Sequence, residues 1–189
     1  MDLAFADVVA TFSDLRLAAI RLAWWRERLE ALDQGTAAPA EPRLEAVEAA
    51  LLPRGITGKE LSQLEDAWLP LLEPFPWGKK QSNGLQLRGT ILFGIGARLL
   101  GREADEAERA GALWSLVDGA QHCSDSYSRD CLREHAATVL ASIDKPLPRQ
   151  LRVLTVLAAL AAADTVHEAG GLKRLSSALK HRLWGTFPR

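Results

Sequence analysis

The densest group of chemically active side chains lies in residues 121–131, which read Gln-His-Cys-Ser-Asp-Ser-Tyr-Ser-Arg-Asp-Cys. His122, Cys123 and Cys131, together with His135, have the residue types of a zinc site. Tetrahedral zinc sites pair their ligands two to four residues apart, which this spacing does not do. In one continuous helix the two cysteines would also be offset by about 80°. The spacing disfavours zinc, and the absence of a G-x-S-x-G motif disfavours a serine hydrolase.

A second unusual segment, residues 17–29, carries two adjacent tryptophans among arginines. Trp24 and Trp25 lie about 100° apart on a helix, so one can enter the core while the other faces a groove. Arg21 and Trp25 are i,i+4 neighbours, as are Trp24 and Arg28, which permits cation–π contact. The favoured interpretation is a core anchor beside a solvated basic face.

A third segment places Gly89, Gly94 and Gly96 inside one expected helix. Each costs about 1 kcal/mol relative to Ala in a helix, so something must offset the loss. Close helix packing is the favoured explanation, and room for an apolar ligand beside the helix is the alternative. A dinucleotide-binding fingerprint is excluded, because the third glycine is misplaced and no strand precedes the segment.

The elements that must position these residues are helices. Ala, Leu, Glu and Arg dominate, strand signals are almost absent, and Pro and Gly separate about seven or eight helical segments. Ser13 is a candidate N-cap, and Thr57 with Glu60 fits a capping box. We expect a loop over 74–83 and a helix from Leu85. The prediction is an all-α protein with a single helical bundle.

Composition limits the class of protein. The 189 residues are 48% hydrophobic and 25% charged, with 23 Lys and Arg against 24 Asp and Glu. Disorder is therefore excluded, and a net charge of −1 gives no global attraction to nucleic acid. Two cysteines suit a reducing compartment. The longest apolar run, 153–163, is too short for a transmembrane segment, and no signal peptide opens the chain. We expect a cytoplasmic protein.

Three motifs occur in an informative order. A helix containing R-L-A-W-W-R-E, residues 21–27, precedes one running from G-T to R-L-L-G, residues 89–101; an Asp-bearing helix end follows, and then L-P-R-Q-L-R at 147–152. This order resembles the squalene/phytoene synthase family, the head-to-head isoprenoid synthases. It is most similar to a divergent bacterial branch that resembles a mitochondrial complex I assembly factor. The resemblance covers nearly the whole chain and implies one isoprenoid-synthase-like domain over 1–189, shortened at its N-terminus.

In the active family, two Asp-rich motifs face each other across a cavity and hold Mg²⁺, which binds and ionises an allylic diphosphate. The first motif would fall at the N-terminus of this chain. Asp2 is followed at i+4 by Ala6, and Asp7 lies one position further. The resemblance thus implies a degenerate first carboxylate pair.

The second motif also departs from the family. Its positions map onto Gln121, Ser124, Asp125 and Arg129, so a cation replaces the last carboxylate unless Asp130 is brought in. Asp125 and Arg129, at i,i+4, are expected to pair with each other. The isoprenoid synthase fold is therefore expected to persist without metal-dependent ionisation.

The resemblance implies a non-catalytic protein that binds an isoprenoid or other lipid-like ligand, or a protein partner as an assembly factor does. The candidate ligand-binding residues are Arg88, Arg98, Gln121, Asp125 and Arg129. No cofactor is expected. The alternative is an active prenyltransferase acting on prenyl diphosphates, with Asp125 and Asp130 as the catalytic and metal-binding carboxylates and Mg²⁺ as cofactor.

The final helix, 172–183, allows a helical interaction module. Its cations and the following Trp184 and Phe187 could lie on a membrane surface or a partner. The favoured interpretation is that its leucine stripe, starting at Leu172, closes the bundle and the cations are solvated. A missing N-terminal helix would leave an apolar flank, which favours a homodimer.

Overall fold

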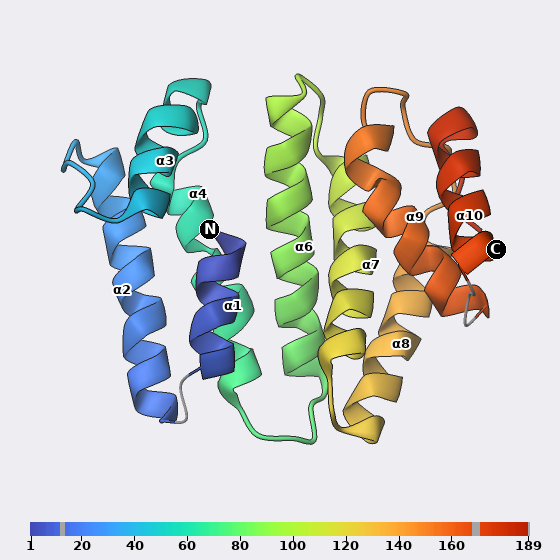
Figure 1. The fold of residues 1–189 in the computed structure, drawn as a ribbon, viewed down its shortest axis with the longest axis horizontal. Helices are drawn as coiled ribbons and strands as arrows, with labels where there is room; N and C mark the ends of the chain where they lie inside the picture. The colour runs from blue at the N-terminus through green and yellow to red at the C-terminus, as the bar shows by residue number, and fades with distance from the viewer. Residues whose placement is uncertain (12–13, 168–170, 189) are drawn as a thin grey trace. The chain divides into compact units, whose positions relative to one another are not determined.

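The protein is all-α, as predicted. The computed structural model describes residues 1–11, 14–167 and 171–188, and within these ranges the regular elements are helices with no β-strand (Figure 1). Ser13, the candidate N-cap, lies outside the described residues; the Asp14 carboxylate accepts the N–H groups of Arg16 and Leu17 at the start of the second helix. The chain divides into two compact units, Met1–Pro74 and Phe75–Arg189.

The first unit is built around the long helix α2. One face of α2 is buried, with Leu22 and Leu29 fully enclosed, and α1, α4 and α5 pack on the helix. The helices of this unit, 3₁₀ turns included, are α1 (Asp2–Thr11), α2 (Leu15–Asp33), α3 (Pro42–Ala50), η1 (Leu52–Arg54), α4 (Gly58–Ser62), α5 (Leu64–Trp68) and η2 (Leu69–Leu72).

The predicted capping box opens α4. Thr57 Oγ1 accepts the Glu60 N–H at 3.1 Å, and the Glu60 carboxylate accepts the Thr57 N–H at 3.0 Å. Asp33, at the end of α2, adds a long-range cap by accepting the N–H groups of Gly58 and Lys59 at 2.7 and 2.8 Å. The start of α4 is therefore fixed both by its own sequence and by α2.

The tryptophan pair divides as predicted. Trp25 is buried against Phe5, while Trp24 is half-buried and meets Trp25 edge-on at 5.0 Å. The Arg21 guanidinium lies 4.5 Å from the Trp24 ring and 5.8 Å from the Trp25 ring. The pair is thus a core anchor with a cation–π contact on its outer side.

In the second unit, α7 is the central helix: it packs against α6, α8 and α9, and α10 packs on α9 (Figure 1). The helices are α6 (Lys79–Leu99), α7 (Asp105–His122), α8 (Ser126–Ala141), α9 (Arg152–His167) and α10 (Gly171–Trp184).

The loop expected over 74–83 is shorter than predicted, because α6 begins at Lys79. The Gly78 N–H donates to Gln81 Oε1 at 3.0 Å, and Ser82 Oγ donates to the Gly78 carbonyl at 3.1 Å. Gln81 and Ser82 are buried. The polar sequence that suggests a loop is instead the capped first turn of the helix, with Lys79 and Lys80 exposed and Gln81 and Ser82 buried.

The glycines of α6 serve close packing. A Cβ on Gly89 would fall on the backbone of Gly111 in α7, and a Cβ on Gly111 would fall on the Gly89 carbonyl. Gly94 lies against Glu108, and Gly96 against Leu154 of α9. Close backbone packing therefore explains Gly89, whereas a Cβ at Gly94 or Gly96 would meet only side-chain atoms of Glu108 or Leu154.

The leucine stripe of α10 does not close the bundle, contrary to the favoured interpretation. Leu172, Leu175, Leu179 and Leu183 are all exposed, whereas His181 is fully buried against α9. The helix is therefore rotated so that its small and polar residues face the core. Among the described residues, no helix is long and apolar enough to cross a membrane.

Candidate functional site

A polar groove between α7, α9 and α10 collects carboxylates and cations in the second unit. Its cavity of about 80 Å³ is lined by Trp114, Asp118 and Gln121 of α7, Asp164 of α9 and Arg174 of α10, with aliphatic side chains between them. One of the predicted ligand-binding residues, Gln121, lines this groove. Another, Arg88, reaches it from α6 through Asp118.

Arg88 forms the innermost ion pair of the groove. Its side chain is buried, its Nη1 lies 2.6 Å from Asp118 Oδ2, and its guanidinium lies 4.7 Å from the Trp114 ring. Ser115 Oγ is 3.5 Å from the same Nη1. The guanidinium is thus held in one orientation by a carboxylate, a hydroxyl and an aromatic face. It acts here as an internal counter-charge and not as an open anion receptor.

The second carboxylate of the groove is also engaged. Gln121 Nε2 donates to Asp164 Oδ2 at 3.1 Å, and Arg174 Nε lies 3.3 Å from Asp164 Oδ1. Asp118 additionally has His122 Nδ1 at 3.6 Å. Each carboxylate is therefore matched by an arginine, which leaves little uncompensated negative charge for a divalent cation.

Asp125 and Arg129 lie at the junction of α7 and α8. The Asp125 carboxylate accepts the N–H and the hydroxyl of Ser128, at 2.8 and 2.6 Å, and so caps α8. These hydrogen bonds, the hydroxyl first, lower the pKa of Asp125 below its ordinary value. The Arg129 guanidinium donates to the carbonyls of Cys123 and Ser124. Arg129 thus binds the carbonyls at the end of α7, and the expected ion pair with Asp125 is not formed.

Asp130 and Arg98 do not line the groove. The Asp130 carboxylate is 74% exposed and lies 3.8 Å from Arg133 on α8. Arg98 is exposed in the last turn of α6. The six predicted site residues therefore form no single cluster in this unit.

The N-terminal aspartates have structural partners inside the first unit. Asp2 Oδ1 accepts the indole N–H of Trp68 at 2.9 Å. Asp7 Oδ2 accepts a hydrogen bond from Arg43 at 3.0 Å. Asp2 thus connects the start of α1 to α5, and Asp7 connects the middle of α1 to α3.

The structure does not bring His122, Cys123, Cys131 and His135, the residues with zinc-ligand chemistry, together as a metal cluster. Cys123 Sγ donates to the Asp125 carbonyl at 3.4 Å, and His135 Nδ1 lies 2.8 Å from Ser82 Oγ. Across the part of the chain that the structure describes, no three His, Cys, Asp or Glu side chains converge as metal ligands would.

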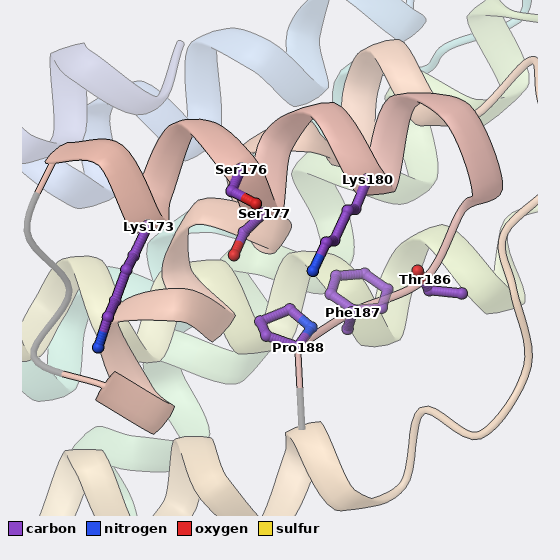
Figure 2. Close-up of a pocket in the computed structure, with 7 residues that line it drawn as sticks. All are labelled: Lys173, Ser176, Ser177, Lys180, Thr186, Phe187 and Pro188. Carbon is purple, nitrogen blue, oxygen red and sulfur yellow. The ribbon is translucent and has the colours of Figure 1, made fainter.

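A larger cavity lies between α10 and the C-terminal segment (Figure 2). Its volume is about 350 Å³. Lys173, Ser176, Ser177 and Lys180 lie on one side of α10, and Figure 2 shows Lys180 ending beside the Phe187 ring and Pro188, with Lys173 at the other end of the cavity. Two ammonium groups and two hydroxyls thus face an apolar wall, a combination suited to an anionic group with an apolar substituent. Thr186 and Phe187 also border a second cavity of about 310 Å³, which Leu140 and Ile143 help to line.

The C-terminal segment that walls this cavity is anchored through its backbone. The Leu147 N–H donates to the Gly185 carbonyl at 2.9 Å, and the Gly185 N–H donates to the His181 carbonyl at 2.7 Å. Gly185 has a φ of +75°, and a Cβ there would fall on the Leu147 backbone. Arg152 adds hydrogen bonds to the carbonyls of Leu147 and Leu183. At position 185 only glycine combines the positive φ with this close approach to Leu147.

His181 connects α10 to the same wall. Its Nε2 lies 2.8 Å from Thr155 Oγ1 on α9, its Nδ1 lies 3.2 Å from the Thr186 carbonyl, and its ring packs on Phe187 at 4.8 Å. Burial lowers the pKa of His181, with a smaller contribution from the Arg152 charge, although the hydrogen bond to Thr186 opposes the shift. The neutral imidazole therefore holds Thr186 and Phe187 in place.

The sequence analysis did not indicate this cavity. The signal was present, because Lys173, Ser176, Ser177 and Lys180 stand at i, i+3, i+4 and i+7 and so share one face of a helix. What the sequence lacks is the return of Phe187 and Pro188 against that face, which depends on the turn at Gly185.

Comparison of the chain with models of known protein families, with curated proteins and with solved structures finds no match.

Proposed function

We propose that this chain is a squalene/phytoene-synthase-like protein, one domain over residues 1–189, that has lost metal-dependent catalysis and binds a small isoprenoid or other lipid-like ligand. Its ligand would carry a phosphate or carboxylate head and a short apolar tail. The proposal joins the motif order of the sequence to the chemistry of the described side chains.

The observation that carries the proposal is the engagement of Asp125 and of the two carboxylates that line the polar groove. Asp118 pairs with Arg88, Asp164 with Arg174, and Asp125 with the N–H and hydroxyl of Ser128. Mg²⁺ binding in the active family relies on carboxylates whose charge is available to the ion. Here an arginine or a capping hydrogen bond already uses that charge, which favours binding over ionisation of a diphosphate.

The cavity beside α10 supports the ligand class. A volume of about 350 Å³ is close to the lower end of ligand pockets, about 300–1,000 Å³. Lys173 and Lys180 would meet the anionic head, and Phe187 would meet the first part of the tail. Geranyl diphosphate is therefore the first probe, since its tail is short.

The test is titration calorimetry with geranyl diphosphate, together with release of pyrophosphate, each with and without Mg²⁺. We expect binding that does not need Mg²⁺ and no release of pyrophosphate. Lys173→Gln with Lys180→Gln should weaken binding about tenfold or more, because charge-assisted hydrogen bonds are lost. The matched control, Arg102→Gln with Arg109→Gln, removes two exposed cations elsewhere in the same unit and should bind as the parent does.

Other outcomes would replace the proposal. Mg²⁺-dependent release of pyrophosphate, abolished in Asp125→Ala, would establish the active prenyltransferase. A folded chain that binds no prenyl phosphate would overturn ligand binding and favour the assembly-factor function with a protein partner.

A further inference from the structure

The exposed face of α10 combines apolar and basic side chains in a defined order. Leu172, Leu175, Leu179 and Leu183 are 85%, 57%, 51% and 61% exposed. On a helical wheel of about 100° per residue they fall within about 80° of one another, on the side opposite the buried His181. Over about 16 Å of helix length, the leucine face therefore points away from the unit to which α10 belongs.

Cations border this leucine face on both sides. Lys173 and Lys180 lie about 80–100° to one side of Leu172 on the wheel, and Arg182 about 80° to the other. All three are exposed. Trp184 ends the helix and is 60% exposed. From Gly171 to Trp184 the sequence contains no acidic residue.

We propose that α10 docks this protein on an anionic lipid surface, with the leucine face inserted among the acyl chains and the flanking cations at the phosphates. Lysine and arginine have long aliphatic stems, so their charges reach the headgroups while the leucines sink below them. Trp184 at the helix end suits the boundary between headgroups and acyl chains.

The charge distribution favours lipid over a second copy of the chain. A symmetric contact between two α10 helices would bring cations against cations, because the helix has no acidic residue to oppose them. An anionic lipid surface supplies negative charge on both sides of the inserted face at once. Each cation near such a surface is expected to strengthen binding about fivefold.

This inference does not rest on the proposed function, because the leucines do not line the cavity. Lys173 and Lys180 belong both to the cavity and to one border of the leucine face. Docking would bring the cavity to the level of the lipid headgroups.

The experiment is co-sedimentation of the full chain with vesicles of phosphatidylcholine alone and with 30% phosphatidylglycerol. We expect binding to the anionic vesicles only, weaker at high salt, with quenching of tryptophan fluorescence by brominated lipid. Leu175→Ser with Leu179→Ser should reduce binding at least tenfold. The control, Leu99→Ser with Leu100→Ser, removes two exposed leucines at the end of α6 and should bind as the parent does.

A second pair of variants tests the charges. Lys180→Gln with Arg182→Gln removes one cation from each border and should weaken binding to anionic vesicles by about 25-fold, or fivefold per charge. Arg102→Gln with Arg109→Gln changes the net charge equally and should have no such effect. Circular dichroism and thermal melting establish that each variant is folded.

Three results would overturn the inference: no binding of the folded parent to anionic vesicles, equal binding by the α10 leucine variant, or binding to polyglutamate as strong as to vesicles and independent of the leucines. A dimer that the leucine variant dissociates, without vesicle binding, would assign the face to a second copy instead. If the parent binds anionic vesicles but not geranyl diphosphate, the proposed function is wrong and this inference stands.

Discussion

Arg88 of α6 and Asp118 of α7 form a 2.6 Å ion pair in which the guanidinium is almost fully buried and the carboxylate is 27% exposed. The two partners are thus unequal. The carboxylate can be hydrated from the groove, whereas the guanidinium packs on Trp114 and Ser115 inside the unit. Removing either partner should have different consequences.

Asp118→Asn is expected to destabilise the protein by about 2–4 kcal/mol, because a buried charge loses its counter-charge. Arg88→Met should cost less, since the remaining carboxylate still has access to water and to His122. Denaturant unfolding of both variants measures the difference. Asp130→Asn, at an exposed carboxylate on α8, is the control and should stay within about 0.5 kcal/mol of the parent. An equal loss of unfolding free energy in Asp118→Asn and Arg88→Met would contradict the conclusion that the two partners differ in burial and in cost.

Gly89→Ala should destabilise the second unit by about 1–3 kcal/mol or more, because its new methyl group would strike the backbone of Gly111 and force α6 and α7 apart. Gly96→Ala is the matched comparison. Its Cβ would meet only the end of the Leu154 side chain, which can turn away, and the helix gains about 1 kcal/mol of propensity. Thermal melting of the two variants tests the close approach of α6 to α7 at Gly89 and Gly111. A melting temperature of Gly89→Ala as high as that of Gly96→Ala would contradict it.

Sequence predicted what depends on local spacing. The all-α class and the Thr57–Glu60 capping box need only neighbours three or four residues away. The orientation of α10 was wrong because periodicity tells which leucines share a face but not whether that face meets the core. Here the hydrogen bond of His181 to Thr155, 26 residues away, accompanies the opposite rotation.

The sequence also could not show which of the candidate site residues lie close together. Arg88 was selected as an anion receptor, yet its partner Asp118 lies 30 residues further along, where the sequence offers no signal of contact. Gln121, a predicted ligand-binding residue, lines the polar groove, but its partner Asp164 stands in an apolar helix 43 residues further along, where the sequence gives no signal of contact. Long-range pairing of charges, and not residue type, decides which arginine is open to a ligand.

Asp125→Ala is expected to lower the melting temperature, whereas Asp125→Ser should restore most of the loss, because serine is also a good N-cap. The hydrogen bonds from Ser128 lower the pKa of Asp125, so the cap contributes fully above the ordinary value of 3.8 and is lost as pH falls through the lower folded pKa. The difference between parent and Asp125→Ala should therefore persist from pH 7 to 5 and shrink in stronger acid. A metal-ligand role predicts the contrary: Mg²⁺ would raise the melting temperature of the parent and not of Asp125→Ser.

His181 should make the wall of the larger cavity sensitive to acid. Burial lowers the pKa of this imidazole in the folded chain, so the unfolded chain binds a proton first. Its stabilising contribution is complete above the ordinary pKa of 6.5 and declines as pH falls below it. We expect melting temperature to fall between pH 7.5 and 5.5. Affinity for geranyl diphosphate should fall at lower pH, where the folded ring itself takes up a proton, because a charge buried against Phe187 would loosen the wall that the ring supports. His181→Gln, which keeps a donor and an acceptor but does not titrate, should flatten both profiles.

His122→Gln is the control at a ring that is 78% exposed and should follow the parent. Parallel pH profiles for the parent and His181→Gln would show that this histidine does not couple acid to the cavity.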